Sequence, residues 1–248
     1  MNIDKLIQLK NNTLTKRMVL VLLILISILY LKVFFTMGVY FNGTFLKRET
    51  ISNEKHYVGK SNQGAVNINV IGRAVDTEKS KAEVIYNLPN NINKRYTVYF
   101  NYIDQWVLGT VEIKDEKDST LFEGRYQKAS LVLYDKNYEP VMDGYIRILN
   151  NGEKEEIYNN DYEIPLKNIV EFSLHEKDEI RGSLGMLLYA AVLIIITVID
   201  IKDPLFFFKL SHFLEVKDPE PSDFYITMQK IGWVVYPIIA LVLLVIAI

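Results

Sequence analysis

Three long apolar runs constrain this chain more than any other feature. They cover residues 18–38, 184–201 and 231–248, and each is close to the length of a helix that crosses a hydrocarbon core of about 30 Å. Three such runs are hard to bury in one small soluble core, so the sequence predicts three transmembrane helices over these ranges. Lys32 can extend its ammonium group to the interface, and Pro237 is tolerated in a membrane helix, which it usually kinks.

The charges before the first run predict its orientation. One acid, Asp4, stands there against four basic residues: Lys5, Lys10, Lys16 and Arg17. Because positive residues favour the cytoplasmic side, residues 1–17 are expected to form a cytoplasmic tail. Residues 39–182 then face outward, and residues 202–230 form a cytoplasmic loop. The expected location is the cell membrane, with the protein crossing it several times.

A cleaved signal peptide is the alternative interpretation of the first run. The basic tail and the apolar core fit a signal peptide, whereas Thr36, Met37 and Gly38 match a small-x-small cleavage site poorly. Both interpretations stay open at this point.

The loop between the second and third runs is expected to contain an amphipathic helix over residues 203–216. Asp203 can cap this helix with Pro204 at its first position. One side of the helix carries Phe206, Phe207, Leu210, Phe213 and Leu214, and the other carries Lys209, Ser211, His212 and Glu215. Such a helix suits the lipid headgroup plane, as a lipid sensor, a docking surface or simply a connection between two spans.

Two further features belong to the start of the third span. Ser222 is a suitable N-cap for a helix that continues into the span. Trp233 and Tyr236 are the aromatic types that anchor helices at the interface. Membrane lipid is therefore an expected partner of this region.

The segment between the first two spans is polar and shows a two-residue periodicity. In residues 95–103, Tyr96, Val98, Phe100 and Tyr102 fall on one face, which is typical of a β-strand. Similar short runs cover residues 66–75, 82–88, 106–114, 120–127, 130–136, 142–149 and 168–176. Turn-like sequences separate them, so we expect an all-β extracytoplasmic domain, an antiparallel sandwich or barrel, over residues 39–182.

Recognisable chemistry is scarce in this sequence. The chain has no cysteine, and its three histidines lack metal-ligand spacing. Neither a G-x-S-x-G elbow nor a phosphate-binding glycine loop occurs. The acidic stretches 115–118 and 175–179 are expected to be a hairpin tip and a solvated linker rather than cation sites. The sequence thus predicts no catalytic residue, no cofactor and no metal.

Exposed aromatic residues give the one candidate ligand site of the β-domain. Tyr99, Tyr102 and Trp106 could form a platform for a ligand, although core packing and cross-strand pairing also explain them. The net charge of -2 indicates no nucleic-acid partner.

Two segments resemble known families. Residues 96–114 and 133–140 resemble uncharacterised bacterial membrane proteins that carry a β-rich extracytoplasmic module between two spans. The matching positions are Tyr102, Gly109, Tyr134, Asp135, Asn137 and Pro140. Residues 220–225, "EPSDFY", which lead into an apolar run, resemble a short uncharacterised bacterial membrane-protein family. Both resemblances imply a bacterial membrane protein, and neither implies an activity.

Three functions remain as hypotheses. The first is a non-enzymatic bacterial envelope protein whose outer β-domain binds a protein or a wall polymer, with a homo-oligomer as another possible assembly. The second is an immunity or accessory protein of a secreted toxin system. The third is a membrane-anchored hydrolase with a carboxylate site in the β-domain. Because no catalytic constellation is visible, the sequence favours the first.

Overall fold

The computed structural model divides the chain into two compact units. A helical unit comprises Met1–Thr36 and Ile180–Ile248, and a β-unit comprises Met37–Glu179. The structure describes the whole chain except residues 1–12, 53, 73–78, 102–107, 128–129, 131, 142–156, 160, 175–176 and 213–219.

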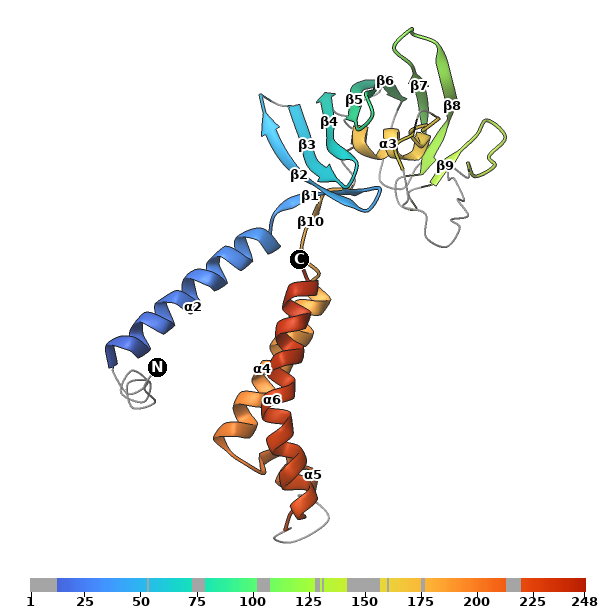
Figure 1. Cartoon of the computed structure of the whole chain (residues 1–248). Helices are drawn as coiled ribbons and strands as arrows, with labels where there is room; N and C mark the ends of the chain where they lie inside the picture. The colour runs from blue at the N-terminus through green and yellow to red at the C-terminus, as the bar shows by residue number, and fades with distance from the viewer. Residues whose placement is uncertain are drawn as a thin grey trace. The chain divides into compact units, whose positions relative to one another are not determined.

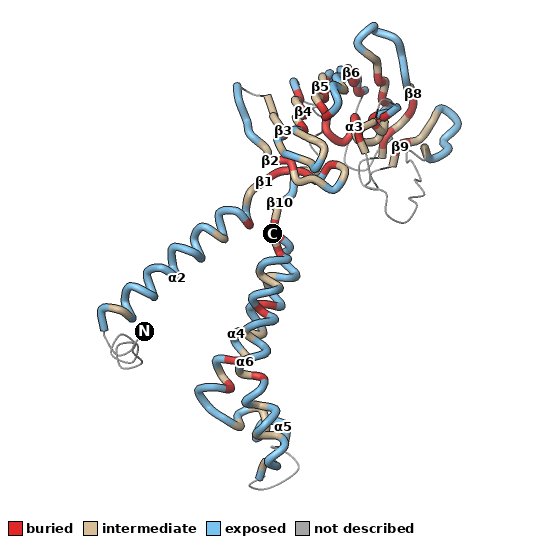
Figure 2. The backbone as a smooth tube through the Cα atoms, viewed as in Figure 1, coloured by how far each residue is buried: buried red, intermediate tan, exposed pale blue. Residues whose placement is uncertain are grey.

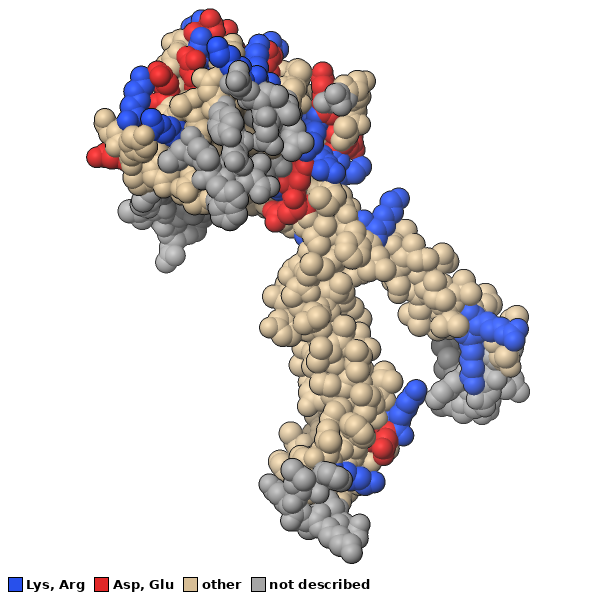
Figure 3. Space-filling view, turned by 180° about the vertical axis from the view of Figure 1, so that it is seen from behind, with Lys and Arg blue, Asp and Glu red and all other residues tan. Residues whose placement is uncertain are grey.

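Three helices among the described residues are long and apolar enough to cross a membrane. They are α2 (Thr13–Phe34), α4 (Leu184–Lys202) and α6 (Asp223–Ile246), with mean hydropathies of 2.4, 2.5 and 2.0. Their leucine, isoleucine and valine residues are largely exposed, and most of each helix is coloured as exposed in Figure 2. In Figure 3 the helices are tan along most of their length, with charged atoms near their ends. Exposed aliphatic surface of this length fits lipid contact.

Backbone hydrogen bonds join one end of each of these three helices. The Gly182 N–H donates to the Phe34 carbonyl at 2.9 Å, and the Ser183 N–H donates to the Ala247 carbonyl at 2.8 Å. Phe34 is fully buried, and a Cβ added to Gly182 would overlap its ring. Glycine at position 182 therefore allows the close approach of these helix ends.

Helices α4 and α6 pack against each other as a hairpin. Their buried residues include Ala190 on α4 and Gly232 and Ala240 on α6. Small residues at such positions let two membrane helices approach closely. Pro237 lies inside α6, as expected.

The connection between α4 and α6 differs in part from the sequence-based expectation. Asp203 is the C-cap of α4, and its N–H donates to the Ile199 carbonyl, so it does not start the next helix. Leu205 follows with φ of 77°, and α5 (Phe206–His212) begins after this turn. The expected N-cap Ser222 is confirmed, because its hydroxyl accepts from the Tyr225 N–H at 3.2 Å.

The β-unit is built on one antiparallel sheet. The strands are β1 (Met37–Phe41), β2 (Thr44–Ile51), β3 (Glu54–Ser61), β4 (Gly64–Gly72), β5 (Ser80–Leu88), β6 (Ile92–Asn101), β7 (Leu108–Lys114), β8 (Thr120–Gln127), β9 (Val132–Tyr134) and β10 (Glu179–Ile180). Their order is β10-β1-β2-β3-β4-β5-β6-β7-β8-β9, so β1 to β9 pair as sequential neighbours (Figure 1). The expected antiparallel β-structure is confirmed, but where an all-β sandwich or barrel was expected, the described strands form a single sheet, and helix α3 (Leu166–Leu174) packs against it.

The first three strands were not expected from the sequence. The turn between β1 and β2 is Asn42-Gly43, with φ of 47° and 72°, flanked by the pair Phe41 and Thr44. Two positive φ values in a two-residue loop are the geometry of a type I′ hairpin, which favours Asn-Gly. The expected strand over residues 142–149 lies outside the described residues.

The expected strand over residues 168–176 is wrong, because residues Leu166–Leu174 form helix α3. Six consecutive residues, from Ile169 to Leu174, are buried. The alternation of Val170, Phe172 and Leu174 with polar neighbours imitates a strand, but α3 contacts strands β4, β5 and β6 and lies within the curve of the sheet (Figure 1). The sheet and this helix enclose the hydrophobic core.

Candidate functional site

A groove of about 500 Å³ opens beside the N-terminal end of α3. We call it the α3 groove. Its lining residues are Lys94, Arg95, Tyr96, Asp115, Glu116, Lys117, Leu121, Glu163, Ile164, Pro165, Leu166 and Ile169. They come from the start of β6, the β7–β8 hairpin and the segment that leads into α3. Tyr96, Ile164 and Ile169 are buried, so the groove has an apolar floor and a charged rim.

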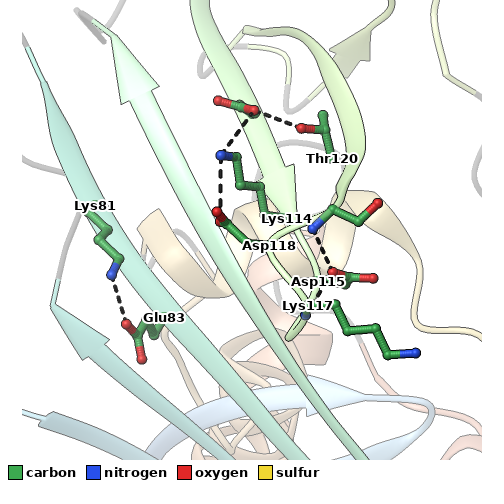
Figure 4. Close-up of polar contacts among 9 residues, drawn as sticks. Lys81, Glu83, Lys114, Asp115, Lys117, Asp118 and Thr120 are labelled. Atoms are coloured by element: carbon green, nitrogen blue, oxygen red, sulfur yellow. Dashed lines mark hydrogen bonds and ion pairs between the residues drawn. The ribbon is translucent and has the colours of Figure 1, made fainter.

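The tip of the β7–β8 hairpin is one wall of the α3 groove. The Asp115 Oδ1 accepts hydrogen bonds from the Lys117 N–H at 2.9 Å and the Ser119 N–H at 2.8 Å (Figure 4). Asp118 has φ of 63°, and the Asp115 N–H donates to the Ser119 carbonyl at 3.0 Å. These contacts fix the loop, which holds Glu116 and Lys117 at the rim. The prediction of a hairpin tip is confirmed.

The loop after β9 repeats this arrangement. The Asp135 Oδ1 accepts from the Asn137 N–H and the Glu139 N–H, both at 2.8 Å, and Tyr138 has φ of 65°. Residues 133–140, which resemble a family motif, therefore form an aspartate-capped turn. In both loops the aspartate side chain accepts hydrogen bonds from backbone N–H groups of the turn, as in an Asx-turn.

The opposite wall of the groove is the segment before α3. Tyr158 and Tyr162 are buried against each other with ring centroids 5.3 Å apart. The Asn42 amide nitrogen donates to the Tyr162 hydroxyl at 2.8 Å, and the Asn90 amide nitrogen donates to the Tyr158 carbonyl at 2.5 Å. These contacts place Glu163 and Pro165 beside β6.

The rim of the α3 groove carries both signs of charge. Its acids are Asp115, Glu116 and Glu163, and its bases are Lys94, Arg95 and Lys117. Within the described part of the chain, no ion pair involves these three bases. They are therefore available to an acidic or polar ligand.

Tyr96 is the polar residue at the base of the groove. Burial, together with the nearby acids Glu163, Asp115 and Glu116, raises the pKa of Tyr96 to about 12. Its hydroxyl therefore stays protonated at neutral pH and acts as a neutral hydrogen-bonding group. Among the described residues that line the groove, carboxylates and amines supply the charged groups.

The predicted aromatic platform is only partly described. Tyr99 is about one-third exposed and lies on the face of β6 opposite the buried Val98 and Phe100. The Lys114 ammonium group lies 5.4 Å from the Tyr99 ring centroid, a cation–π contact. Tyr102 and Trp106 lie outside the described residues. The groove contains Tyr96 instead, on the other face of the same strand.

The outer face around Tyr99 is a surface of paired charges. Lys81 and Glu83 form an ion pair at 2.9 Å, and Lys114 lies 3.5 Å from Asp118 (Figure 4). Thr120 donates to Glu112 at 2.9 Å. These residues satisfy one another, which leaves this face fewer free groups than the α3 groove has.

A second charged cluster centres on Asp178. Its carboxylate accepts from Arg48 at 2.6 Å, Lys55 at 2.7 Å and the Tyr57 hydroxyl at 2.8 Å. Burial alone would raise the pKa of Asp178, but the bonds from Lys55, Tyr57 and Arg48 outweigh it and lower that pKa below its usual value. Burial and the Asp178 contact raise the pKa of Tyr57. Asp178, expected in a solvated linker, instead ties the end of the β-unit to β2 and β3; His175 and Glu176 lie outside the described residues.

The predicted interface residues lie on α5 and α6. Phe206 and Leu210 are exposed and Phe207 is half-buried. Phe208 packs against Tyr225 of α6 with ring centroids 4.9 Å apart, so it holds α5 to α6. Tyr236 is exposed on α6. Phe213 and Leu214 lie outside the described residues, and a membrane-surface role for this group stays a prediction.

Asp200 makes a polar contact that sequence reasoning missed. Its carboxylate accepts from the Gln229 amide nitrogen and the Trp233 indole N–H, both at 2.7 Å, and the residue is nearly buried. Trp233 thus uses its N–H within the α4–α6 hairpin. The i, i+4 spacing of Gln229 and Trp233 puts both on one face of α6.

This helical hairpin is also the part of the chain with a known counterpart. Residues 189–247 match DUF6199, a family of unknown function. The match includes the contact of Asp200 with Gln229 and Trp233, as well as the "EPSDFY" segment, and it leaves the β-unit outside. No curated protein and no solved structure matches the chain.

Proposed function

We propose that this protein is a non-enzymatic component of a bacterial envelope that binds a partner in the α3 groove. In this proposal α2, α4 and α6 span the cell membrane, the N-terminus is cytoplasmic and the β-unit lies outside. The partner is a protein segment or a wall polymer with charged groups of both signs.

The observation that carries the proposal is the form of the α3 groove. An apolar floor surrounded by a few polar and charged groups is the usual composition of a ligand site. Lys94, Arg95 and Lys117 have no ion-pair partner among the described residues, and Glu116 faces the same groove. Acidic and basic groups on one ligand would find complementary charges here.

The fixed hairpin tip supports a binding site that is already formed before the partner binds. Asp115 holds the loop through two hydrogen bonds, so the rim is ordered before a partner arrives. An ordered rim reduces the conformational entropy lost on binding. The same bonds give Asp115 Oδ1 a structural role in the loop.

The experiment is site-specific photocrosslinking of the full-length protein in its native membrane. A photoreactive amino acid replaces Leu121, which is about half exposed in the groove, and the control replaces Ile51 on β2, which is similarly exposed outside it. We expect position 121, and not position 51, to capture one discrete product. A wall-polymer product would shift in size after wall digestion.

Charge reversal in the groove completes this test. Lys94→Glu together with Arg95→Glu should abolish the product from position 121, because both residues line the groove. Equal products from positions 121 and 51, or a product unaffected by the reversal, would contradict the proposal. Capture of a second copy of the chain would contradict binding of a different partner and would show self-association through the α3 groove instead.

A further inference from the structure

Three side chains at the end of the β-unit form an unusual cluster. The Lys177 ammonium nitrogen lies 3.2 Å from the Asn168 Oδ1 and also contacts the Glu171 Oε2. Asn168 and Glu171 are one turn apart on α3, so they share a side of the helix. An amine, a carboxamide and a carboxylate thus meet at one point.

Glu171 is the most deeply buried member of this cluster. Its side chain is 1% exposed, and neither carboxylate oxygen has a hydrogen bond of regular geometry with the described residues. Lys167 lies 3.6 Å from the other oxygen, and aromatic residues of the core follow at Phe172. A buried carboxylate is costly unless it is paired or protonated, and here Lys177 and Lys167 supply the pairing, so the amine of Lys177 is held against a buried base.

We propose that Lys177 and Asn168 become joined by an intramolecular amide bond, with Glu171 transferring the protons. A proton moves from the Lys177 ammonium group to the Glu171 carboxylate, which leaves a neutral amine and a carboxylic acid. The amine nitrogen attacks the Asn168 Cγ, and Glu171 hydrogen-bonds the carbonyl oxygen as the tetrahedral intermediate forms. Glu171 then shuttles a proton from the attacking nitrogen to the leaving nitrogen.

The products of this step balance without a further reactant. The C–N bond of the Asn168 carboxamide breaks, a C–N bond to Lys177 forms, and one ammonia molecule leaves. No oxidant, metal or cofactor takes part. The departing ammonia takes the proton that Glu171 received from Lys177, so it leaves as an ammonium ion and Glu171 returns to the carboxylate form.

The geometry favours this step over a simple ion pair. A carbonyl bond of about 1.2 Å puts the Lys177 nitrogen no farther than about 4.4 Å from the Asn168 Cγ, so a side-chain movement of about 1 Å brings it to the roughly 3–3.5 Å of a near-attack arrangement. Burial of Glu171 lets it exchange protons out of contact with bulk water. The bond would tie α3 to the segment before β10 in a chain whose lack of cysteine excludes any disulfide.

Peptide mass spectrometry of the denatured full-length protein tests the proposal. Trypsin cleaves after a free Lys177 and yields the linear peptide 168–177. An amide-linked Lys177 resists cleavage, so we expect the peptide 168–181, lighter by one ammonia molecule, with fragment ions that join positions 168 and 177. A succinimide at Asn168 would also lose ammonia, but it would leave Lys177 cleavable.

Three variants complete the test. Lys177→Arg and Glu171→Gln should each leave the Asn168 carboxamide intact, whereas Lys167→Arg, the matched control on the same helix, should keep the linked peptide. Recovery of the wild type as the linear peptide 168–177 would overturn the proposal. That measurement needs no variant and therefore does not depend on whether a variant folds. A linked peptide that persists in Glu171→Gln would overturn the role of Glu171.

Discussion

The Asp178 cluster gives the sharpest prediction about stability. Asp178→Asn keeps the size of the side chain and removes the negative charge that Arg48 and Lys55 share. Removing one partner of a buried ion pair costs about 3–5 kcal/mol. The Asp178, Lys55 and Arg48 side chains are 13%, 22% and 28% exposed, so water offsets part of this loss. We therefore expect the free energy of unfolding of the β-unit to fall by about 2–4 kcal/mol.

A urea titration of the full-length protein in detergent measures this loss. The folded fraction of the β-unit is the fragment that survives a brief pulse of protease at each urea concentration. With a urea dependence of about 2 kcal/mol/M, the midpoint should fall by about 1–2 M. The control is Glu49→Gln on β2, which breaks the exposed Lys47–Glu49 pair and should leave the midpoint unchanged within error, because exposed pairs contribute little.

The pH dependence of this difference has a definite sign. Because the pKa of Asp178 is lowered in the folded state, its contribution is fully present above the ordinary Asp value of 3.8 and is lost as the pH falls below it. The gap between wild type and Asp178→Asn should therefore be constant near neutral pH and shrink under more acidic conditions. Equal midpoints at neutral pH, or a gap that widens on acidification, would refute the reasoning.

Three further predictions concern the helical unit and the hairpin tip. Gly182→Val should loosen the helix junction, because the added carbon atoms overlap the Phe34 ring. Limited proteolysis between α2 and β1 should speed up relative to Gly185→Val, because a Cβ at position 185 would meet only the Ser183 Oγ, at 4.0 Å. Asp200→Leu should leave Gln229 and Trp233 without their shared acceptor and lower the melting temperature in detergent by several degrees, whereas Asp200→Asn, which keeps an acceptor, should lower it less. Asp115→Ala should weaken capture from position 121 several-fold by loosening the hairpin tip, while Asp135→Ala, the same change in the matching β9 loop, should not; equal effects would contradict a role for the tip.

Much of the architecture could be predicted from the sequence, because it depends on local patterns. The apolar runs predicted the three long helices. The alternation of Tyr96, Val98 and Phe100 predicted a strand, and these three residues lie on its buried face. The Ser222 cap could also be predicted, because its hydroxyl accepts a hydrogen bond from an N–H only three residues away.

The errors arose where distant parts of the chain decide the outcome. Val170, Phe172 and Leu174 alternate like a strand, yet Glu171 and Ser173 between them are buried as well, and the segment forms helix α3 against β4, β5 and β6. Asp203 looked like the start of a helix, but the preceding turn of α4 uses it as a cap.

The candidate sites were hidden for the same reason. The α3 groove combines β6, the β7–β8 hairpin and the segment before α3, which only the fold brings together. In the sequence Asp178 is one acid among several. Its partners Arg48 and Lys55 lie far earlier in the chain, and only the fold brings them into contact with it. The same holds for Asp200, whose partners lie on the next span.

The proposed function requires the β-unit and α5 to lie on opposite sides of the membrane, and labelling in intact cells tests this most directly. Because the chain has no cysteine, Lys60→Cys on β3 and Lys209→Cys on α5 each create a unique exposed thiol. A membrane-impermeant maleimide should label position 60 in intact cells and position 209 only after lysis. Labelling of position 209 in intact cells, with position 60 protected until lysis, would contradict an outward-facing α3 groove.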